Sequence, residues 1–257
     1  MTLSGSVTLI PVPINGEVVP GDNLGHLLFS ALREQKLSLQ SGDVLVIKHK
    51  IVSKAEGRFV ELSSVKPSLQ AKKWSRQSGA DARVVELALR ESRAIVRKKV
   101  IGGRGVLITE ARNGMVCANS GVDLSNVNGG THALLLPKDA DKSAARLRSA
   151  VKRKMGVEVA MIISDSFGRP WREGLTEAAI GVAGMKPLLD FRGKRDPHGY
   201  TLRASAEAVA DELACAAGLV CGKLNGVPVC IVRGFRYAAG RGSARELVRA
   251  RQNDLFR

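Results

Sequence analysis

The chain has 257 residues, 44% of them apolar, and 40 Lys and Arg residues against 24 Asp and Glu residues give it a formal net charge of +16. This length suffices for one large hydrophobic core or two small interlocked ones, and the charge favours anionic partners. Because the basic residues are dispersed and aromatic residues make up only 4% of the chain, the composition argues against a nucleic-acid-binding protein, which clusters its basic residues or interleaves them with aromatic ones.

Apolar β-branched runs, typical of strands, alternate irregularly with segments of helical periodicity. In chain order we predict a strand at 7–12, a helix at 23–35, a strand at 43–48, helices at 68–78 and 82–91, strands at 93–96, 106–109 and 133–136, a helix at 141–155, a strand at 157–163, a helix at 204–223, a strand at 227–232 and a helix at 243–251. This irregular order favours an α+β fold over a doubly wound sheet. Because the sequence shows neither a linker nor an internal repeat, we predict a single unit over residues 1–257.

The sequence also indicates where the protein resides. It has no run of the roughly 18 apolar residues that a membrane-spanning helix needs, and its first residues lack the pattern of a secretory signal. The four cysteines form no CxxC pair, which is typical of free thiols in a reducing compartment. We therefore predict a soluble, cytoplasmic protein without a membrane partner.

Three polar segments directly follow or interrupt apolar strands, and such places commonly carry functional groups. They are "KHKIVSKAEGR" at 48–58, "CANSGVDLSN" at 117–126 and "SDSFGRPWREG" at 164–174. We expect all three to be loops at strand ends.

Asp123 and Asp165 are the best candidates for metal ligands, since each stands among small residues. Mg²⁺ takes one or two carboxylates and completes its shell with water, hydroxyl and phosphate oxygens. Ser166 offers such a hydroxyl, and Asn126 could bind a nucleotide or a metal-bound water. The alternative is that these Asp and Asn side chains cap turns.

Basic side chains in the same segments could bind anions. Lys54 could neutralise a phosphate group, or it is an inert surface lysine; a Walker-type phosphate loop is missing from the sequence. Arg169 and Arg172 flank Trp171, and guanidinium groups held flat by an aromatic ring recognise carboxylates and phosphates. The alternative is that Trp171 packs and the arginines extend to solvent.

Five stretches together resemble the coenzyme F420 γ-glutamyl ligase family and occur in the family's order over nearly the whole chain. They are "GDVLVIKHKIVSKAEGR" (42–58), "LITEARNGMVCANSGVDLSNV" (107–127), "LLLPKDADKSAARLR" (134–148), "ISDSFGRPWREGLTEAAIGVAG" (163–184) and "ADELACAAGLVCGKLNGVPVCIVRG" (210–234).

The resemblance implies a GTP-dependent ligase that requires Mg²⁺ or Mn²⁺. Such an enzyme adds L-glutamate in γ-linkage to the deazaflavin F420-0 and releases GDP and phosphate; the number of glutamates added is left open. The resemblance also implies V-shaped, two-lobed α+β subunits that form an intertwined homodimer. Its partners are the small-molecule substrates, and no nucleic acid is expected.

Matching positions imply roles for individual residues. Asp123 and Asp165 correspond to metal ligands, Ser166 takes the place of a hydroxyl ligand, and Lys54 joins the two aspartates as a catalytic residue. Arg169 and Arg172 are expected to hold a substrate carboxylate. The positions that correspond to nucleotide contacts are Asn15, Gly16, Glu17, Val18, His49, Lys54, Asn126, Cys221, Gly222, Lys223, Gly226 and Val227.

The chain departs from the family pattern at several of these positions. It reads "INGEVVPGDN" where members often have "GLPEVRPGDD", and His49 stands where Ser or Gln is common. Lys223 stands where some members have a Glu that binds a second metal, which leaves a second metal open. The chain is also too short for the flavin-reductase-like domain of bifunctional relatives.

The implied mechanism begins with phosphorylation of the substrate carboxylate by GTP, because a free carboxylate is a poor acyl donor. The glutamate amine then attacks the acyl phosphate. Two alternatives stay open from the sequence: an amide-forming ligase that acts on another carboxylate, and a non-catalytic basic module that binds nucleic acid or phosphorylated ligands.

Overall fold

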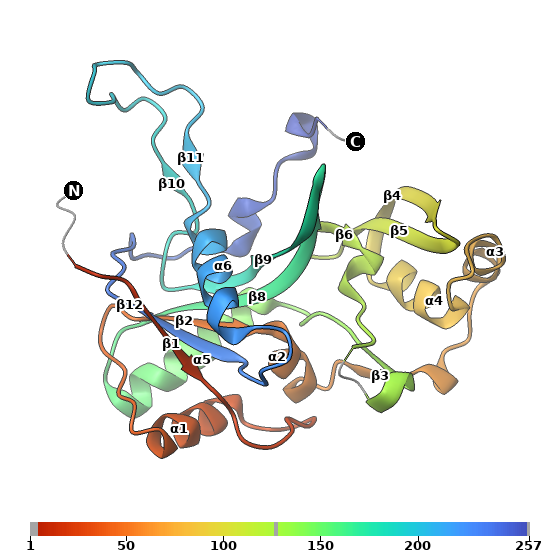
Figure 1. Ribbon diagram of the computed structural model, residues 1–257, viewed down its shortest axis with the longest axis horizontal. Helices are drawn as coiled ribbons and strands as arrows, with labels where there is room; N and C mark the ends of the chain where they lie inside the picture. The colour runs from red at the N-terminus through yellow and green to blue at the C-terminus, as the bar shows by residue number, and fades with distance from the viewer. Residues whose placement is uncertain (1–4, 126–127, 256–257) are drawn as a thin grey trace.

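The computed structural model describes residues 5–125 and 128–255 and shows an α+β protein built around one five-stranded sheet (Figure 1). In spatial order its strands are β1 (Thr8–Val12), β12 (Val229–Arg233), β2 (Val44–Lys48), β8 (Ala160–Arg169) and β9 (Arg172–Ala183). Strands β2 and β8 run parallel, whereas β1–β12, β12–β2 and β8–β9 are antiparallel. The predicted α+β class with mixed and antiparallel sheets is therefore confirmed, while the V-shaped outline and the dimer stay predictions.

The described part of the chain contains six α-helices, four of which begin at a side-chain cap. They are α1 (Leu24–Glu34), α2 (His49–Ala55), α3 (Leu69–Ser78), α4 (Ala82–Arg90), α5 (Ala140–Met155) and α6 (Val209–Cys221). The side chains of Asn23, Ser68, Asp81 and Asp139 accept hydrogen bonds from the first turns of α1, α3, α4 and α5, which stabilises a helix N-terminus. The helices predicted at these four places are confirmed.

Both faces of the sheet are buried. Leu45 and Ile47 of β2 pack with α1 and α5 on one face, whereas Val44 and Val46 pack with α6 on the other. Since successive side chains of a strand point to opposite faces, a strand between two helical layers is apolar at every position. The run "VLVIK" has this composition, which explains why β2 lies at the centre of the sheet.

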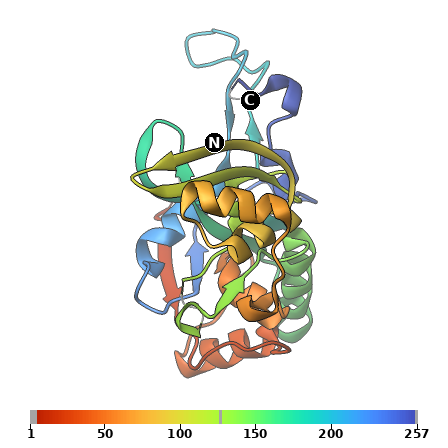
Figure 2. The same ribbon diagram turned by 90° about the vertical axis from the view of Figure 1, so that its right-hand side faces the viewer.

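A second group of elements lies beside the main sheet and has its own core (Figures 1 and 2). It comprises the sheet of β4 (Ser92–Ile101), β5 (Arg104–Ala111) and β6 (Val116–Ala118), helices α3 and α4, and the pair β3 (Phe59–Glu61) and β7 (His132–Leu134). Trp74, Val85, Ala88 and Leu107 form the centre of this core. No helix in the described part of the chain has the length and apolar character of a membrane span.

The last predicted helix is wrong, and the helix predicted at 204–223 is too long. Residues 243–251 form two short 3₁₀ helices, Ala244–Leu247 and Arg251–Asn253, because Val248 between them is extended. The helix α6 begins only at Val209, because the residues before it form the strand β11 (Ala206–Glu207), which pairs with β10 (Leu189–Asp190) in the arm at the upper left of Figure 1.

The segment 164–174 is not a loop, which corrects the expectation for Asp165 and Ser166. Strand β8 continues through both residues to Arg169 and turns at Pro170 and Trp171 into β9. Small residues dominate the second half of β9, and they let the helices on both faces pack closely against this strand. For the same reason β9 lacks the run of β-branched residues that marks the other strands in the sequence. Sequence periodicity therefore did not predict β9.

Helix α2 also replaces an expected loop. Residues 49–55, placed in the polar segment after β2, form a seven-residue helix that begins at His49 without a side-chain cap. Short uncapped helices of this kind depend on tertiary packing rather than on local signals.

Replacing Gly181 of β9 with Ala is expected to lower the free energy of unfolding by about 1–3 kcal/mol, the usual cost of overpacking a core. A Cβ atom at Gly181 would lie 2.5 Å from the backbone C and O atoms of Ala140, so α5 would have to move. The matched control is Gly168→Ala in the same hairpin, where the nearest heavy atom to the added Cβ is 3.9 Å away. Urea denaturation measures both variants, and equal losses of stability would contradict the packing argument.

Candidate functional site

A cleft of about 630 Å³ lies where β2 ends beside β8. Because these two strands are parallel, their carboxyl ends meet at the same edge of the sheet. The cleft brings together five segments that lie far apart in the sequence. Its lining residues are Ile14, Gly16, Glu17, Val18, Lys48, His49, Lys50, Ile51, Lys54, Asp123, Ser125, Ser164, Asp165, Ser166, Leu175, Glu177, Gly222, Lys223, Leu224, Gly226, Val227 and Pro228.

Helix α2 carries two lysines into this cleft. Lys50 and Lys54 are four residues apart and therefore lie on the same side of the helix. The Nζ atom of Lys50 lies 2.7 Å from Oδ2 of Asp123 and donates a hydrogen bond to Oγ of Ser125 at 2.6 Å. The Nζ atom of Lys54 lies 2.9 Å from Oε1 of Glu17. Both ammonium groups thus face acids at the cleft wall.

Asp123 is fixed by its backbone and its side chain. Its N–H donates to the carbonyl of Leu134 at 3.0 Å, and its own carbonyl accepts from the N–H of Leu134 at 2.8 Å. Burial raises the pKa of Asp123, but the hydrogen bonds from Lys50 and Ser125 outweigh burial and hold the pKa below its usual value. Asp123 is therefore an ionised carboxylate that can accept a cation.

Asp165 faces a buried histidine. The Nε2 atom of His49, a residue only 2% exposed, lies 3.1 Å from Oδ1 of Asp165, and its Nδ1 atom lies 3.3 Å from Oγ of Ser53. Although Asp165 is close, Nε2 makes no hydrogen bond within the described structure. The Oδ1 atom of Asp165 accepts a hydrogen bond from the N–H of Ser166 at 2.7 Å. His49 thus contacts a predicted metal ligand.

Glu177 of β9 is a third acid in the cleft, and the sequence analysis missed it. Its Oε1 atom lies 2.7 Å from Nζ of Lys48 and accepts a hydrogen bond from Ser166 at 2.7 Å, while its Oε2 atom accepts from Ser164 at 2.9 Å. Burial raises the pKa of Glu177, but these hydrogen bonds outweigh it and lower the pKa. The one signal in the sequence is a single acid inside the apolar run "LTEAAIGVAG".

The predicted site residues are only partly brought together. Lys54, Asp123, Asp165, Ser166 and most of the predicted nucleotide contacts line the cleft. Asp165 and Ser166, however, are adjacent in β8 and point to opposite faces. The remaining predicted contacts are not among the lining residues: Asn15 donates to Glu34, Cys221 is buried at the end of α6, and Asn126 lies outside the described residues.

The two predicted substrate arginines also lie outside the cleft lining. Arg169 and Arg172 stand at the tip of the β8–β9 hairpin, where Arg169 donates to the carbonyl of Glu173 at 3.1 Å. Trp171 between them is 81% exposed, so it does not pack into the core. Their role in holding a carboxylate stays a prediction.

The donor set suits a hard cation held by few protein ligands. Among residues 5–125 and 128–255, no three His, Cys, Asp or Glu side chains gather in a metal-binding arrangement. Asp123 and Asp165 can supply two carboxylates, and Mg²⁺ or Mn²⁺ would complete its shell with water and ligand oxygens. The residues present therefore fit a metal that is bound together with a phosphate-bearing substrate.

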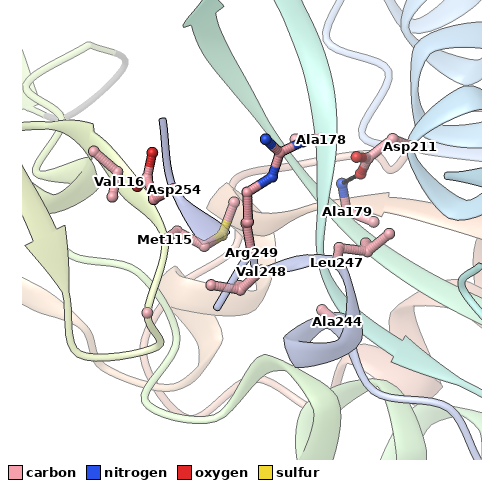
Figure 3. A pocket seen from close by; sticks show the side chains of 11 residues that line it. Met115, Val116, Ala178, Ala179, Asp211, Ala244, Leu247, Val248, Arg249 and Asp254 are labelled. Carbon is pink, nitrogen blue, oxygen red and sulfur yellow. Dashed lines mark hydrogen bonds between the residues drawn. The ribbon is translucent and has the colours of Figure 1, made fainter. Parts of the chain in front are cut away.

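A smaller cavity of about 260 Å³ lies between the C-terminal segment and strands β6 and β9 (Figure 3). Its walls are mostly apolar, with Asp211 of α6 and Arg249 of the C-terminal segment among them. Asp211 accepts a hydrogen bond from the N–H of Ala179 at 2.8 Å, and burial raises its pKa. None of the predicted site residues lines this cavity, so the larger cleft is the candidate site.

The chain is similar to known proteins over nearly its whole length. The sequence model of the family described as "F420-0:Gamma-glutamyl ligase" matches residues 14–234. The chain is 43% identical to a protein of Methanothermobacter thermautotrophicus over 98% of this chain and 99% of that protein. It is 43% identical to a protein of Methanopyrus kandleri over 96% of each chain, and 40% identical to one of Methanocaldococcus jannaschii over 96% of this chain and 94% of that protein. All three relatives are named "Coenzyme F420:L-glutamate ligase".

Replacing Lys50 with Met removes its ion pair with Asp123 and is expected to lower the free energy of unfolding by about 1 kcal/mol at pH 7. The value is modest because the side chain of Asp123 is 33% exposed, so solvent screens the interaction between the two charges. The folded-state pKa of Asp123 is lowered, so its stabilising contribution is present above the unfolded-state pKa of about 4 and is lost as the pH falls through the folded-state pKa. The difference between variant and wild type should therefore disappear in acid.

A double-mutant cycle with Asp123→Asn, measured by urea denaturation, isolates the pair from the other contacts of Lys50. A coupling free energy that is the same at pH 7 and at pH 3 would show that the two residues interact by packing rather than by charge.

Proposed function

The chain belongs to the F420-0:γ-glutamyl ligase family, and from this premise we propose that it joins the amine of L-glutamate to the carboxylate of F420-0, adds any further glutamate in γ-linkage, and converts GTP to GDP and phosphate. The relatives' names support coenzyme F420 as the substrate that supplies the carboxylate and L-glutamate as the amino acid that is joined to it. The charges of the cleft support a nucleotide and a divalent metal, Mg²⁺ or Mn²⁺. A cytoplasmic, intertwined homodimer remains part of the same proposal.

The observation that carries this proposal is the pairing of acids with basic side chains across the cleft. Lys50 faces Asp123, His49 faces Asp165, Lys48 faces Glu177 and Lys54 faces Glu17. A nucleotide that arrives with a metal brings both signs of charge. Asp123 can then exchange Lys50 for the metal, and Lys50 and Lys54 can exchange their carboxylates for phosphates, so that each of these charges keeps a partner.

The chemistry needs two steps because a carboxylate does not react with an amine directly. An oxygen of the F420-0 carboxylate first attacks the γ-phosphorus of GTP, the bond from that phosphorus to the β,γ-bridging oxygen breaks, and GDP leaves. The neutral amine of glutamate then attacks the acyl carbon, phosphate leaves and the amine loses a proton. The product is an amide, with one GDP and one phosphate formed for each glutamate added.

The protein's contribution to the first step is positioning and charge. Phosphoryl transfer is catalysed mainly by alignment and by neutralising the transferring group. Lys50 and Lys54 can hold phosphate oxygens, and Asp123 and Asp165 would hold the metal, which when bound neutralises charge on the phosphates. The loop residues Gly16 and Gly226, which also line the cleft, have no side chain and leave room for the backbone to approach the nucleotide.

The reaction itself is the first test. Incubated with F420-0, GTP, L-glutamate and Mg²⁺ or Mn²⁺, the protein is expected to form glutamylated F420, detected by mass spectrometry, with one GDP released per glutamate. The same experiment counts how many glutamates are added. GTP consumption without a glutamylated deazaflavin would assign the protein to another carboxylate substrate, and no GTP consumption with either metal would contradict the ligase proposal.

Asp123→Asn and Asp165→Asn should each fold and lose metal-dependent GTP turnover by orders of magnitude, because each removes one of two carboxylates that would hold the metal. Steady-state kinetics across a range of Mn²⁺ concentrations measures the effect. Asp139→Asn is the matched control, since Asn also caps helices and Asp139 lies outside the cleft lining. Near wild-type turnover in either cleft variant would show that its aspartate does not hold the metal.

A further inference from the structure

Strand β8 divides the charged groups of the cleft between the two faces of the sheet. Asp165 points to the face that carries His49, whereas Ser164 and Ser166 point to the face covered by α6, because neighbouring side chains of a strand alternate. Lys48 follows Val44 and Val46 of β2, which pack with α6. The groups on this face form one hydrogen-bonded unit, here called the α6-side group: Lys48, Ser164, Ser166, Glu177 and Lys223.

Glu177 is fixed at the centre of the α6-side group. Its carboxylate contacts Lys48, Ser164 and Ser166, each within 2.9 Å. The helix α6 packs directly against it, since a Cβ atom at Gly218 would lie 2.7 Å from Cγ of Glu177. This carboxylate therefore cannot turn to a metal without breaking several contacts at once.

The hydroxyl of Ser166 is occupied on two sides. It donates to Oε1 of Glu177 at 2.7 Å and accepts from Nζ of Lys223 at 2.8 Å. Two ammonium groups and one carboxylate leave the α6-side group with a net charge of +1. A divalent cation at Ser166 would be repelled by this charge, whereas an oxyanion would be attracted.

The two ammonium groups keep donors for a ligand. Each lysine has three N–H donors; one of Lys48 faces Glu177 and one of Lys223 goes to Ser166. Both side chains line the cleft, so their other donors can reach a bound molecule. Lys48 and Lys223 thus form a pair of positive charges whose positions are set by an acid and a hydroxyl.

We propose that the α6-side group is an oxyanion subsite, in which Lys48 and Lys223 bind a phosphate or carboxylate of a substrate and no divalent cation binds at Ser166. Glu177 is the positioning residue of this subsite. The identity of the substrates rests on the proposed function, but the subsite itself does not. Of the three metal ligands implied by the resemblance, this proposal keeps Asp123 and Asp165 as ligands and removes Ser166.

The first experiment counts Mn²⁺ bound to the full chain by electron paramagnetic resonance in the presence of a non-hydrolysable GTP analogue. Asp165→Asn should lose bound Mn²⁺, whereas Ser166→Ala should bind as many ions as the wild type. Loss of an ion in Ser166→Ala would overturn the proposal. The count needs no glutamylation, so it stands or falls separately from the proposed reaction.

The second experiment measures binding by titration calorimetry with three probes: the GTP analogue, F420-0 and L-glutamate. Lys223→Gln should weaken one of them by about tenfold to a hundredfold, the effect of losing a charged hydrogen bond. Weaker binding of the GTP analogue identifies a nucleotide phosphate in the subsite, weaker binding of glutamate identifies a carboxylate, and weaker binding of F420-0 identifies an oxyanion of the acceptor substrate. Unchanged binding of all three would overturn the proposal. Lys194→Gln, on the β10–β11 arm, is the control.

The positioning role of Glu177 is tested against Lys48. Glu177→Gln should raise the KM of the same substrate more than it changes kcat, and the double variant Lys48→Met with Glu177→Gln should bind that substrate no more weakly than Lys48→Met alone, because the two residues act as one unit. Fully additive losses of affinity would show that Glu177 acts independently of Lys48 and would overturn its assignment.

Discussion

The cleft depends on the parallel pairing of β2 with β8. This pairing places the end of β2 beside Ser164 of β8, and helices cover both strands on the two faces of the sheet. Residues that follow β2 and continue β8 are therefore held close together although more than a hundred positions separate them. Without this pairing the lysines of α2 and Asp165 of β8 would not be held next to each other.

Charge balance is the second organising feature. Asp123, Glu177 and Glu17 each have a lysine close to them, and Asp165 has His49, before any ligand binds. Metal and nucleotide would exchange partners with these pairs, so binding of one prepares the site for the other. By thermodynamic linkage the effect is reciprocal: the metal should raise the affinity for the nucleotide by the same factor as the nucleotide raises the affinity for the metal.

Local signals in the sequence predicted the parts of the fold that they control. The apolar run of β2 and the helical periodicity of α1, α3, α4 and α5 were sufficient to place those elements. The sequence analysis missed strand β9 because its small residues, which allow close packing of the helices, hide the alternation of apolar and polar side chains that is typical of a strand. It missed α2 because this short helix has no capping residue that would mark its start. In both cases tertiary contacts decide the structure.

The candidate site follows the same division. The segments around Asp123, Asp165 and Lys54 were found because acids and lysines after apolar strands are conspicuous. Glu177 was not, since only the strand register that places it opposite Ser166 reveals its partners. That register also separates Asp165 from Ser166, a difference that adjacency in the sequence cannot show.

The close contact between α6 and Glu177 links two positions that are 41 residues apart. A side chain larger than glycine at position 218 would displace Glu177, and a bulkier residue at position 177 would push α6 away from the sheet. Among relatives that keep this packing, positions 177 and 218 should therefore covary. The helix that covers the sheet thus restricts which acids the cleft can acquire during evolution.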